Sequence, residues 1–236
     1  MVINKIIAVE GLDKTGKSTF CKAFEMAYSQ MNGINTQKLE VMSFPNITTP
    51  IGHSIRTELK SNTPNPDIVN TPSFLSEMSH YWMQQLFNNT KSSINETQNT
   101  NNQIINTDII STKNYLFDRY FISTLAYQAF YNNSQLDLDF IKTALNVNKF
   151  IKLPSDIIFL DLPNDIILER TIADQKKGLT DKNDTLDLKI IEKRREAYFK
   201  SIEFLKGNGI NIHWFEDSSL NTPEDLSKVL LGKIFN

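Results

Sequence analysis

The sequence of 236 residues contains a single cysteine, Cys21, which excludes an internal disulfide framework and a zinc site built from several cysteines. A lone cysteine favours a reducing compartment, and we expect the cytoplasm, or a host's cytoplasm if the chain is viral. No stretch approaches the ~18 consecutive apolar residues that a membrane span needs, and the N-terminal stretch is too short for a signal peptide. The 25 basic and 27 acidic residues give a net charge of −2, so neither nucleic acid nor a membrane is an expected partner.

Short apolar runs alternate along the chain with segments of helical periodicity. Five runs are expected to form strands, at residues 6–9, 37–44, 115–117, 157–160 and 210–215. Helical patterns fill the intervals, at residues 17–32, 51–60, from 71 onward, 121–132, 137–150, 164–174, 187–206 and from 222 onward. Parallel neighbours need crossover connections, so this order predicts a three-layer α/β/α fold around a mostly parallel five-stranded sheet. With no repeat and no linker, residues 1–236 are expected to form a single domain.

Two polar segments interrupt this alternation. Residues 88–106 contain seven asparagines among 19 positions, and we interpret them as a surface insertion or a frayed helix end. This bias suggests an AT-rich genome, such as that of a virus, a phage or a protist. Residues 175–186 form a loop of lysines and acids, which is typical of a solvated surface loop and also of a lid that closes over phosphates.

The most specific local pattern is the segment Gly11–Ser18, which matches G-x-x-x-x-G-K-[ST] at every fixed position. An apolar strand precedes it and an amphipathic helix follows it, so backbone N–H groups and the helix N-terminus are expected to face one anion. We expect Lys17 to reach the β- and γ-phosphates of a nucleoside triphosphate and Ser18 to bind Mg²⁺. Thr19 either contacts the α-phosphate or is an ordinary first-turn threonine. The predicted triphosphate-binding residues of this segment are therefore Gly11, Thr15, Gly16, Lys17, Ser18 and Thr19.

Other features narrow the class of phosphate-loop protein. The strand at 157–160 is not followed by the base-reading N-K-x-D motif of switch GTPases, and motors and helicases normally need a longer chain with further motifs. Asp13, an acidic residue inside the loop, favours a kinase that acts on small molecules. A carboxylate inside an anion-binding loop is electrostatically costly, so we expect Asp13 to have a partner.

Asp118 and Arg119 directly follow the apolar run 115–117. They are therefore expected at the carboxyl edge of the sheet, where open α/β sheets bind ligands. The planar guanidinium of Arg119 suits the phosphate of an acceptor monophosphate, unless it forms a surface ion pair with Asp118. Asp118 is expected to meet Mg²⁺ through water, or else to cap a helix.

Separated motifs make the chain similar to the thymidylate kinase family of P-loop nucleoside monophosphate kinases. Glu10–Thr19 resembles the family pattern EGLDxxGKST, and Asp118–Gln128 resembles the more diagnostic DRYxxSxxAYQ. Ser43-Phe44-Pro45 resembles the aromatic–proline turn after the second strand. Ile157–Arg170 is similar to the strand and helix before the lid. The resemblance covers nearly the whole chain except Asn88–Asn106.

This resemblance implies a reaction and a set of site residues. ATP would pass its γ-phosphoryl group to dTMP with Mg²⁺ as cofactor, giving dTDP and ADP, in what is commonly a homodimer. Asp13 would accept a hydrogen bond from the 3′-hydroxyl group of the acceptor. Lys14 stands where some members place an arginine that touches the transferring group, although a solvated loop charge explains it equally well. Arg170 would stack on adenine, and Lys182 of the lid would approach the phosphates. The nucleoside pocket would include Phe44, Pro45, Ser123, Tyr127 and Gln128.

Base recognition is where the sequence departs from the family. On the helix after the second strand, the positions of the family's base-reading arginine and stacking aromatic are occupied by Tyr81 and Glu77. Phe74, His80 and Tyr81 remain as pocket candidates, and each also suits an ordinary amphipathic helix. The family's arginine after Phe-Pro is absent as well, and Arg56 is the only arginine nearby.

These departures leave alternatives to dTMP open. The acceptor is expected to be dTMP, with dUMP, a cytidine nucleotide or a modified deoxynucleotide as alternatives. A deoxynucleoside kinase is less consistent with Asp13 and with the Asp118-Arg119-Tyr120 run. A nucleotide-binding scaffold without phosphoryl transfer is prompted by the missing arginine.

Overall fold

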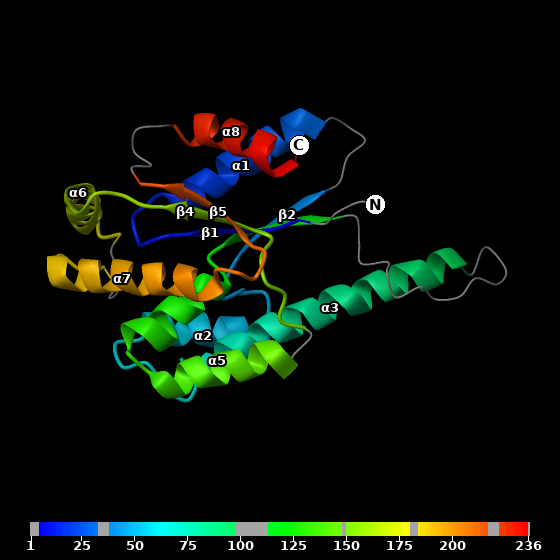
Figure 1. The fold of residues 1–236 in the computed structure, drawn as a ribbon, viewed down its shortest axis with the longest axis horizontal. Helices are drawn as coiled ribbons and strands as arrows, with labels where there is room; N and C mark the ends of the chain where they lie inside the picture. Colours follow the sequence, from blue (N-terminus) through cyan, green and yellow to red (C-terminus); the bar gives the residue numbers. More distant parts are fainter. Residues whose placement is uncertain are drawn as a thin grey trace.

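The computed structural model describes residues 5–32, 38–97, 113–147, 150–179, 184–216 and 222–235. Within these residues, a central five-stranded sheet is covered by helices on both faces (Figure 1). The strand order is β2-β3-β1-β4-β5, and every neighbouring pair is parallel. The predicted α/β fold is confirmed, and the sheet is parallel throughout rather than mostly so. The strands are β1 (Ile6–Glu10), β2 (Leu39–Ser43), β3 (Asn114–Asp118), β4 (Asp156–Leu160) and β5 (Asn211–Phe215).

Successive side chains of β1 point to opposite faces of the sheet, and this alternation builds two apolar layers. Ile7 and Val9 belong to the layer under α1 (Lys17–Asn32) and α8 (Pro223–Phe235), which lie side by side in Figure 1. Ala8 belongs to the layer on the other face, together with Phe117, Trp82 and Tyr198. The helices of that second face include α2 (Pro50–Lys60), α3 (Thr71–Thr97), α5 (Gln135–Val147) and α7 (Leu188–Leu205).

The remaining elements refine the predicted boundaries. The helix expected at 121–132 is a short α4 (Phe121–Thr124) continued by a π-helical segment, η2 (Leu125–Tyr131). The helix after β4 is α6 (Asn164–Lys176). Residues 88–97 of the asparagine-rich segment continue α3, while residues 98–106 lie outside the described residues. The helix expected at 137–150 begins two residues earlier and is described to Val147.

The register of the sheet determines what meets at its carboxyl edge. Val9 of β1 pairs with Asp118 of β3, and the Arg119 N–H donates to the Val9 carbonyl at 3.0 Å. The loop that follows β1 and the residues that follow β3 are therefore neighbours. Ligand sites of open parallel sheets lie at this edge.

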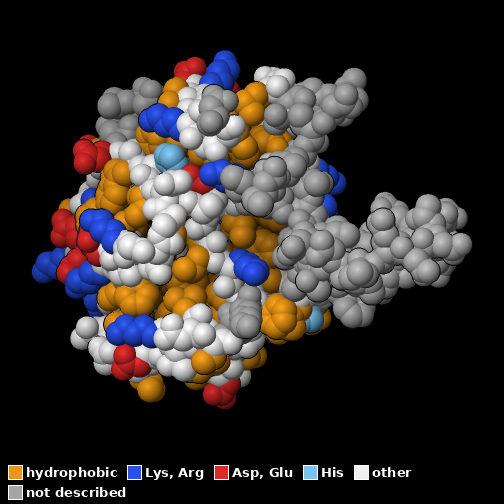
Figure 2. Space-filling view, turned by 45° about the vertical axis from the view of Figure 1, so that its right-hand side comes forward, with side chains coloured by type: hydrophobic (Ala, Val, Ile, Leu, Met, Phe, Trp, Pro, Cys, Tyr) orange, Lys and Arg blue, Asp and Glu red, His pale blue; other side chains and the backbone are white. Residues whose placement is uncertain are grey.

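The surface shows exposed apolar side chains over the α3–α5 layer. Met83 on α3 and Phe140 and Val147 on α5 are exposed. On the face shown in Figure 2, hydrophobic side chains gather in the lower half of the view, at the height of α3, α5 and α7 in Figure 1. None of the helices in the described part of the chain is both long and apolar enough to span a membrane.

Candidate active site

The phosphate-binding loop follows β1 directly, and two glycines shape it. Gly11 has a φ of +146° and Gly16 a φ of +89°, which favour glycine. A Cβ atom at Gly11 would lie 2.2 Å from the carbonyl oxygen of Leu160 in β4, so a larger residue would collide with the sheet. The buried Thr15 hydroxyl donates to the Leu12 carbonyl at 2.9 Å and closes the turn. The N-terminus of α1 thus borders the cavity in front of the loop, where its partial positive charge favours an anion.

Lys17 is buried and folded over this loop. Its ammonium group donates to the Leu12 carbonyl and lies 3.5 Å from the Thr15 hydroxyl. Burial, followed by the nearby Arg119 guanidinium, lowers the pKa of Lys17 to about 8, although nearby carboxylates oppose this shift. Triphosphate oxygens in front of the loop would supply the charged acceptors that favour the ammonium form.

Ser18 and Asp118 are in direct contact, because the serine hydroxyl donates to an Asp118 carboxylate oxygen across 100 positions of sequence. Both residues line the cavity in front of the loop. A hydroxyl and a carboxylate oxygen suit Mg²⁺, which needs only one or two protein ligands when phosphate and water supply the rest. The described residues contain no cluster of three or more His, Cys, Asp or Glu side chains that could hold a metal alone. Ser18 and Asp118 could therefore supply two of the ligands of a magnesium ion.

Asp13 has a cationic partner, because the Arg119 guanidinium forms an ion pair with its carboxylate. Arg119 has a φ of +66°, a left-handed conformation that costs a non-glycine residue about 1–2 kcal/mol. The arginine also donates to the Gly11 carbonyl at 3.2 Å and to the Tyr198 hydroxyl at 2.7 Å. Burial alone would raise the pKa of Asp13, but Arg119 and then Lys17 hold it below its ordinary value. Asp13 is thus a carboxylate, and Arg119 pairs with it rather than with Asp118.

Glu10 holds the two motifs together, and the sequence interpretation had not singled it out. Its buried carboxylate accepts from the Ser123 hydroxyl at 2.5 Å and from the backbone N–H of Tyr120 at 2.9 Å. Burial raises the pKa of Glu10, and the hydrogen bond from Ser123 opposes that rise. The sequence does contain one indication of this role. Glu10 is an acidic residue at the end of an apolar strand, and a carboxylate buried there needs hydrogen-bond donors.

A cavity of about 600 Å³ lies in front of the phosphate loop. Its size is typical of sites for small molecules. Thr19 and Arg170 line it, and Arg170 donates to the Lys14 carbonyl at 2.8 Å. Lys14 forms ion pairs with Asp174 at 2.8 Å and Asp184 at 2.9 Å, so it is not a freely solvated loop charge. The predicted lid residue Lys182 lies outside the described residues.

A second cavity of about 340 Å³ adjoins the first. It contains aromatic walls together with hydroxyl and amide groups, as expected for a site that binds a nucleoside. Asp13, Arg56 and Arg119 line both cavities, so these three side chains mark their junction. Six residues expected in the nucleoside pocket line this second cavity, namely Phe44, Pro45, Phe74, Ser123, Tyr127 and Gln128.

Two other pocket candidates lie elsewhere, which corrects the expectation drawn from the helix pattern. Tyr81 is buried in the core, where its ring contacts Phe44 and Phe117 edge-on and its hydroxyl donates to Glu40 at 3.2 Å. His80 is bonded to Gln84 on the same helix and does not line the second cavity. The phase of α3 turns Phe74 toward the cavity and these two side chains away from it.

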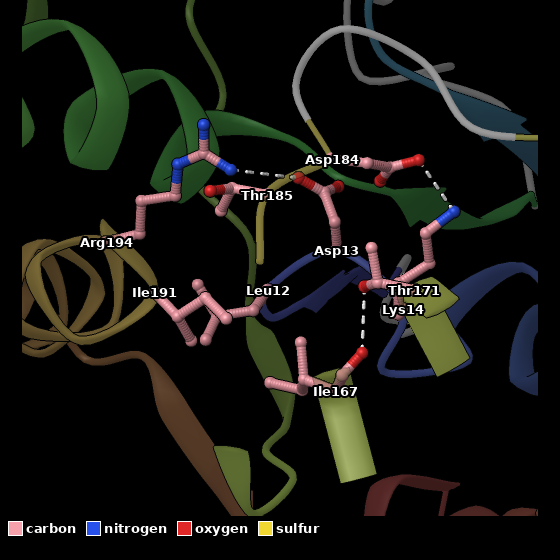
Figure 3. Close-up of a pocket in the computed structure, with 9 residues that line it drawn as sticks. All are labelled: Leu12, Asp13, Lys14, Ile167, Thr171, Asp184, Thr185, Ile191 and Arg194. Atoms are coloured by element: carbon pink, nitrogen blue, oxygen red, sulfur yellow. Dashed lines mark hydrogen bonds and ion pairs between the residues drawn. The ribbon is translucent and has the colours of Figure 1, made fainter. Parts of the chain in front are cut away.

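Arg194 of α7 is a cavity residue that the sequence interpretation missed. Its guanidinium lies 3.9 Å from the Asp13 carboxylate and over the Tyr131 ring, 5.8 Å from the centre of that ring. Figure 3 shows how Arg194 approaches Asp13 from one side while Lys14 of the same loop turns toward Asp184. The only sequence signal was a basic residue on a long charged helix, which does not indicate the direction of the side chain.

The fold and this double cavity define the class of protein, a P-loop nucleoside monophosphate kinase. The family model for thymidylate kinase matches residues 9–213. A thymidylate kinase from Leptospira borgpetersenii is 31% identical over 203 residues, covering 84% of this chain and 82% of the relative. One from Leptospira interrogans is 28% identical over 200 residues, covering 82% and 79%. The chain belongs to the thymidylate kinase family.

A solved structure supports the same fold. The crystal structure of thymidylate kinase from Ehrlichia chaffeensis matches with a TM-score of 0.59 and covers 98% of each chain. Its sequence identity to this chain is 16%, so the likeness shows the shared architecture alone.

Proposed function

We propose that the protein transfers the γ-phosphoryl group of ATP to dTMP, giving dTDP and ADP. The observation that carries this proposal is that two cavities meet at Asp13 and Arg119: the cavity in front of the phosphate loop, called the donor cavity below, and the aromatic second cavity, called the acceptor cavity. Such a junction would bring donor and acceptor phosphates together, and alignment with charge neutralisation is the main requirement of phosphoryl transfer. Family membership indicates ATP as donor and dTMP as acceptor.

Each side chain has a role in this proposal. Lys17 neutralises the donor phosphates, and Ser18 and Asp118 would hold Mg²⁺, which supplies further positive charge when bound. Asp13 accepts from the acceptor's 3′-hydroxyl and keeps Arg119 in place beside the acceptor phosphate. Lys14 acts on the transferring group only if its two ion pairs open. The remaining donor-side residues are Gly11, Thr15, Gly16, Thr19, Arg170 and Lys182.

The acceptor can be tested with a panel of nucleotides. We expect the protein with MgATP to convert dTMP to dTDP with the highest kcat/KM, dUMP with a lower one, and thymidine not at all, as followed by chromatography of the products. A Lys17→Ala variant should lose about 100-fold or more in turnover, whereas Lys22→Ala, an exposed lysine on the same helix, should not. Conversion of thymidine but not dTMP would indicate a nucleoside kinase. ATP binding without turnover would indicate a scaffold.

The assembly and compartment are also part of this proposal. We propose a homodimer in the cytoplasm, because exposed apolar side chains on α3 and α5 need cover and the single cysteine is buried and unpaired. Light scattering should give twice the chain mass of 27.1 kDa. A monomer at micromolar concentration would contradict the dimer and leave the kinase proposal intact.

A further inference from the structure

Arg119 is held by a tyrosine that belongs to neither sequence motif and lines neither cavity. This tyrosine, Tyr198, lies on α7 and is fully buried. Its hydroxyl accepts a hydrogen bond from the Nη1 atom of Arg119 at 2.7 Å. The same Nη1 atom donates over longer distances to the Gly11 carbonyl, at 3.2 Å, and to the Ser123 hydroxyl, at 3.3 Å. Tyr198 is therefore the nearest of the acceptors that fix this side of the guanidinium.

The direction of each hydrogen bond around Tyr198 can be worked out from Glu10. The Glu10 side chain accepts from the Ser123 hydroxyl at 2.5 Å and from the backbone N–H groups of Tyr120 and Ser123 at 2.9 and 3.3 Å. A distance of about 2.5–2.7 Å is typical of a hydroxyl that donates to a charged oxygen, and an ionised carboxyl group only accepts. The single proton of the Ser123 hydroxyl is therefore directed at Glu10.

The bond between Ser123 and Tyr198 then has one possible direction. Their hydroxyl oxygens lie 2.9 Å apart. Since the proton of Ser123 is already used, Tyr198 donates and Ser123 accepts. The lone pairs of the Tyr198 oxygen remain available for the N–H of Arg119. The result is a directed chain of hydrogen bonds through four side chains, in the order Arg119, Tyr198, Ser123 and Glu10.

Opposite charges stand at the two ends of this chain. A guanidinium donates into it and a buried carboxylate accepts from it, so both hydroxyl groups between them are polarised in the same sense. Hydrogen bonds in such a chain strengthen one another, and a low local dielectric strengthens each of them further. Burial raises the pKa of Tyr198 well above its ordinary value, although Arg119 opposes this shift, so the tyrosine keeps the proton that it donates.

Packing fixes the Tyr198 ring independently of these hydrogen bonds. The ring contacts Tyr127 edge-on, with 5.8 Å between the ring centres, and lies 5.5 Å from the ring of Phe159 in β4. Phenylalanine at this position would keep both ring contacts. The hydroxyl can therefore be removed without removing the side chain that fills this part of the core.

We propose that Tyr198 is a positioning residue for phosphoryl transfer. Its hydroxyl connects the buried charge of Glu10 to the Arg119 guanidinium and fixes that guanidinium at the junction of the two cavities. This inference rests on the proposed function, in which Arg119 lies beside the acceptor phosphate. It gives α7, the helix after the predicted lid, a part in the transfer step through a residue that borders neither cavity.

Tyr198→Phe tests the role of the hydroxyl. With MgATP and dTMP, we expect kcat to fall about 5- to 30-fold, because a hydrogen bond to a charged group is lost, while the KM for ATP changes less than threefold. The matched control is Tyr28→Phe, which removes a buried hydroxyl that accepts from Asn114 at 2.8 Å in the apolar layer on the other face of the sheet. This control should lower stability by a similar amount and leave both kinetic constants unchanged.

A double variant tests the chain of hydrogen bonds itself. Ser123→Ala breaks the same chain one step further from Arg119. In that background, Tyr198→Phe should lower kcat by less than threefold, since the connection to Glu10 is already lost. If the two losses multiply instead, the two hydroxyl groups act independently and the proposed connection is wrong.

The outcomes separate the possible failures. If Tyr198 serves only the core, Tyr198→Phe will behave like Tyr28→Phe, with an unchanged kcat, and the inference is wrong while the kinase proposal stands. If Tyr198→Phe does not fold, Ser123→Ala decides by the same split between kcat and the KM for ATP. If the wild-type protein phosphorylates no nucleoside monophosphate in a panel of dTMP, dUMP and dCMP, the proposed function and the inference fail together.

Discussion

The Arg119 guanidinium forms an ion pair with the Asp13 carboxylate across 106 positions of sequence. This contact joins the phosphate loop after β1 to the turn after β3, and Glu10 reinforces the same joint through Ser123 and Tyr120. Both residues border the donor cavity and the acceptor cavity. In the proposed reaction the pair would lie between the two substrates, where it should influence the transfer step more than the binding of ATP.

Asp13→Asn removes the negative member of this pair. We expect kcat to fall about 100-fold while the KM for ATP changes less than threefold, since the loss affects orientation at the junction. Because Arg119 and Lys17 hold the pKa of Asp13 below its ordinary value, the acid limb of the wild-type kcat profile should not come from this residue. Steady-state kinetics would check this, with the exposed Asp67→Asn as control. A kcat within threefold of the wild type would remove Asp13 from the mechanism.

Lys17→Met should stabilise the protein in the absence of nucleotide. The folded state lowers the pKa of Lys17 from 10.5 to about 8, so between these values the unfolded chain binds a proton that the folded chain does not. The contribution of Lys17 to the free energy of unfolding therefore rises as the pH rises from about 8 to 10.5. At pH 7 the variant should gain on the order of 2–3 kcal/mol.

Urea unfolding at pH 7 and pH 10 would measure this difference. The advantage of Lys17→Met should shrink at the higher pH, whereas Lys22→Met, an exposed lysine on α1, should show no such trend. A variant less stable than the wild type at both pH values would show that burial of this ammonium is compensated in the folded state.

Arg194→Met tests the cavity residue contributed by α7. Arg194 approaches Asp13 of the phosphate loop and lies over the rings of Tyr127 and Tyr131, so its loss should widen the acceptor cavity and remove one cation from beside Asp13. We expect the KM for dTMP to rise about 5- to 20-fold, from one lost charge-assisted contact. Lys200→Met, which breaks an exposed pair on the same helix, is the matched control. An equal rise in the KM for ATP would argue for a general distortion instead.

Asp156 provides a test at the opposite edge of the sheet. Its buried carboxylate is bonded to His213 at 3.1 Å and forms an ion pair with Lys5 at 3.3 Å. Burial would raise the pKa of Asp156, but the hydrogen bonds from His213 and Ser155 lower it on balance. The stability it provides is present above its unfolded pKa near 3.8 and is lost as pH falls through the lower folded value.

Asp156→Asn should therefore cost about 1–3 kcal/mol at pH 7 and progressively less below pH 4. Its kinetic constants should be those of the wild type, because the amino ends of the strands lie away from the ligand edge. Chemical unfolding at several pH values would check this, with Asp139→Asn breaking an exposed pair for comparison. Loss of activity in a variant that is as stable as the wild type would mean that residues at the amino ends of the strands affect the active site.

The features that sequence predicted well are those that short segments determine. The strand at Ile6–Glu10 follows from a β-branched apolar run, and the phosphate loop follows from residues at fixed spacing. The order of elements fixes a parallel sheet, because each crossover needs a helix. The position of Asp118 and Arg119 at the ligand edge follows from the end of their strand.

The features that sequence did not predict depend on packing between distant elements. His80 and Tyr81 are adjacent on α3, and only packing against Phe44 and Phe117 decides which face of the helix is buried. Arg56 and Arg194 come from helices whose patterns indicate amphipathic surfaces but not the cavity they border. The π-helical segment η2 was not predicted either, because nothing in its local sequence distinguishes a π-helix from the α-helix expected at 121–132.

In the proposed reaction, one cleft passes a phosphoryl group from ATP directly to dTMP. The most direct measurement is a single turnover of the wild-type protein with ATP labelled in the γ-phosphate, in the presence of Mg²⁺ and dTMP. The label should appear in the β-phosphate of dTDP, with ADP formed in equal amount. Label released as inorganic phosphate while dTMP stays unchanged would contradict the account.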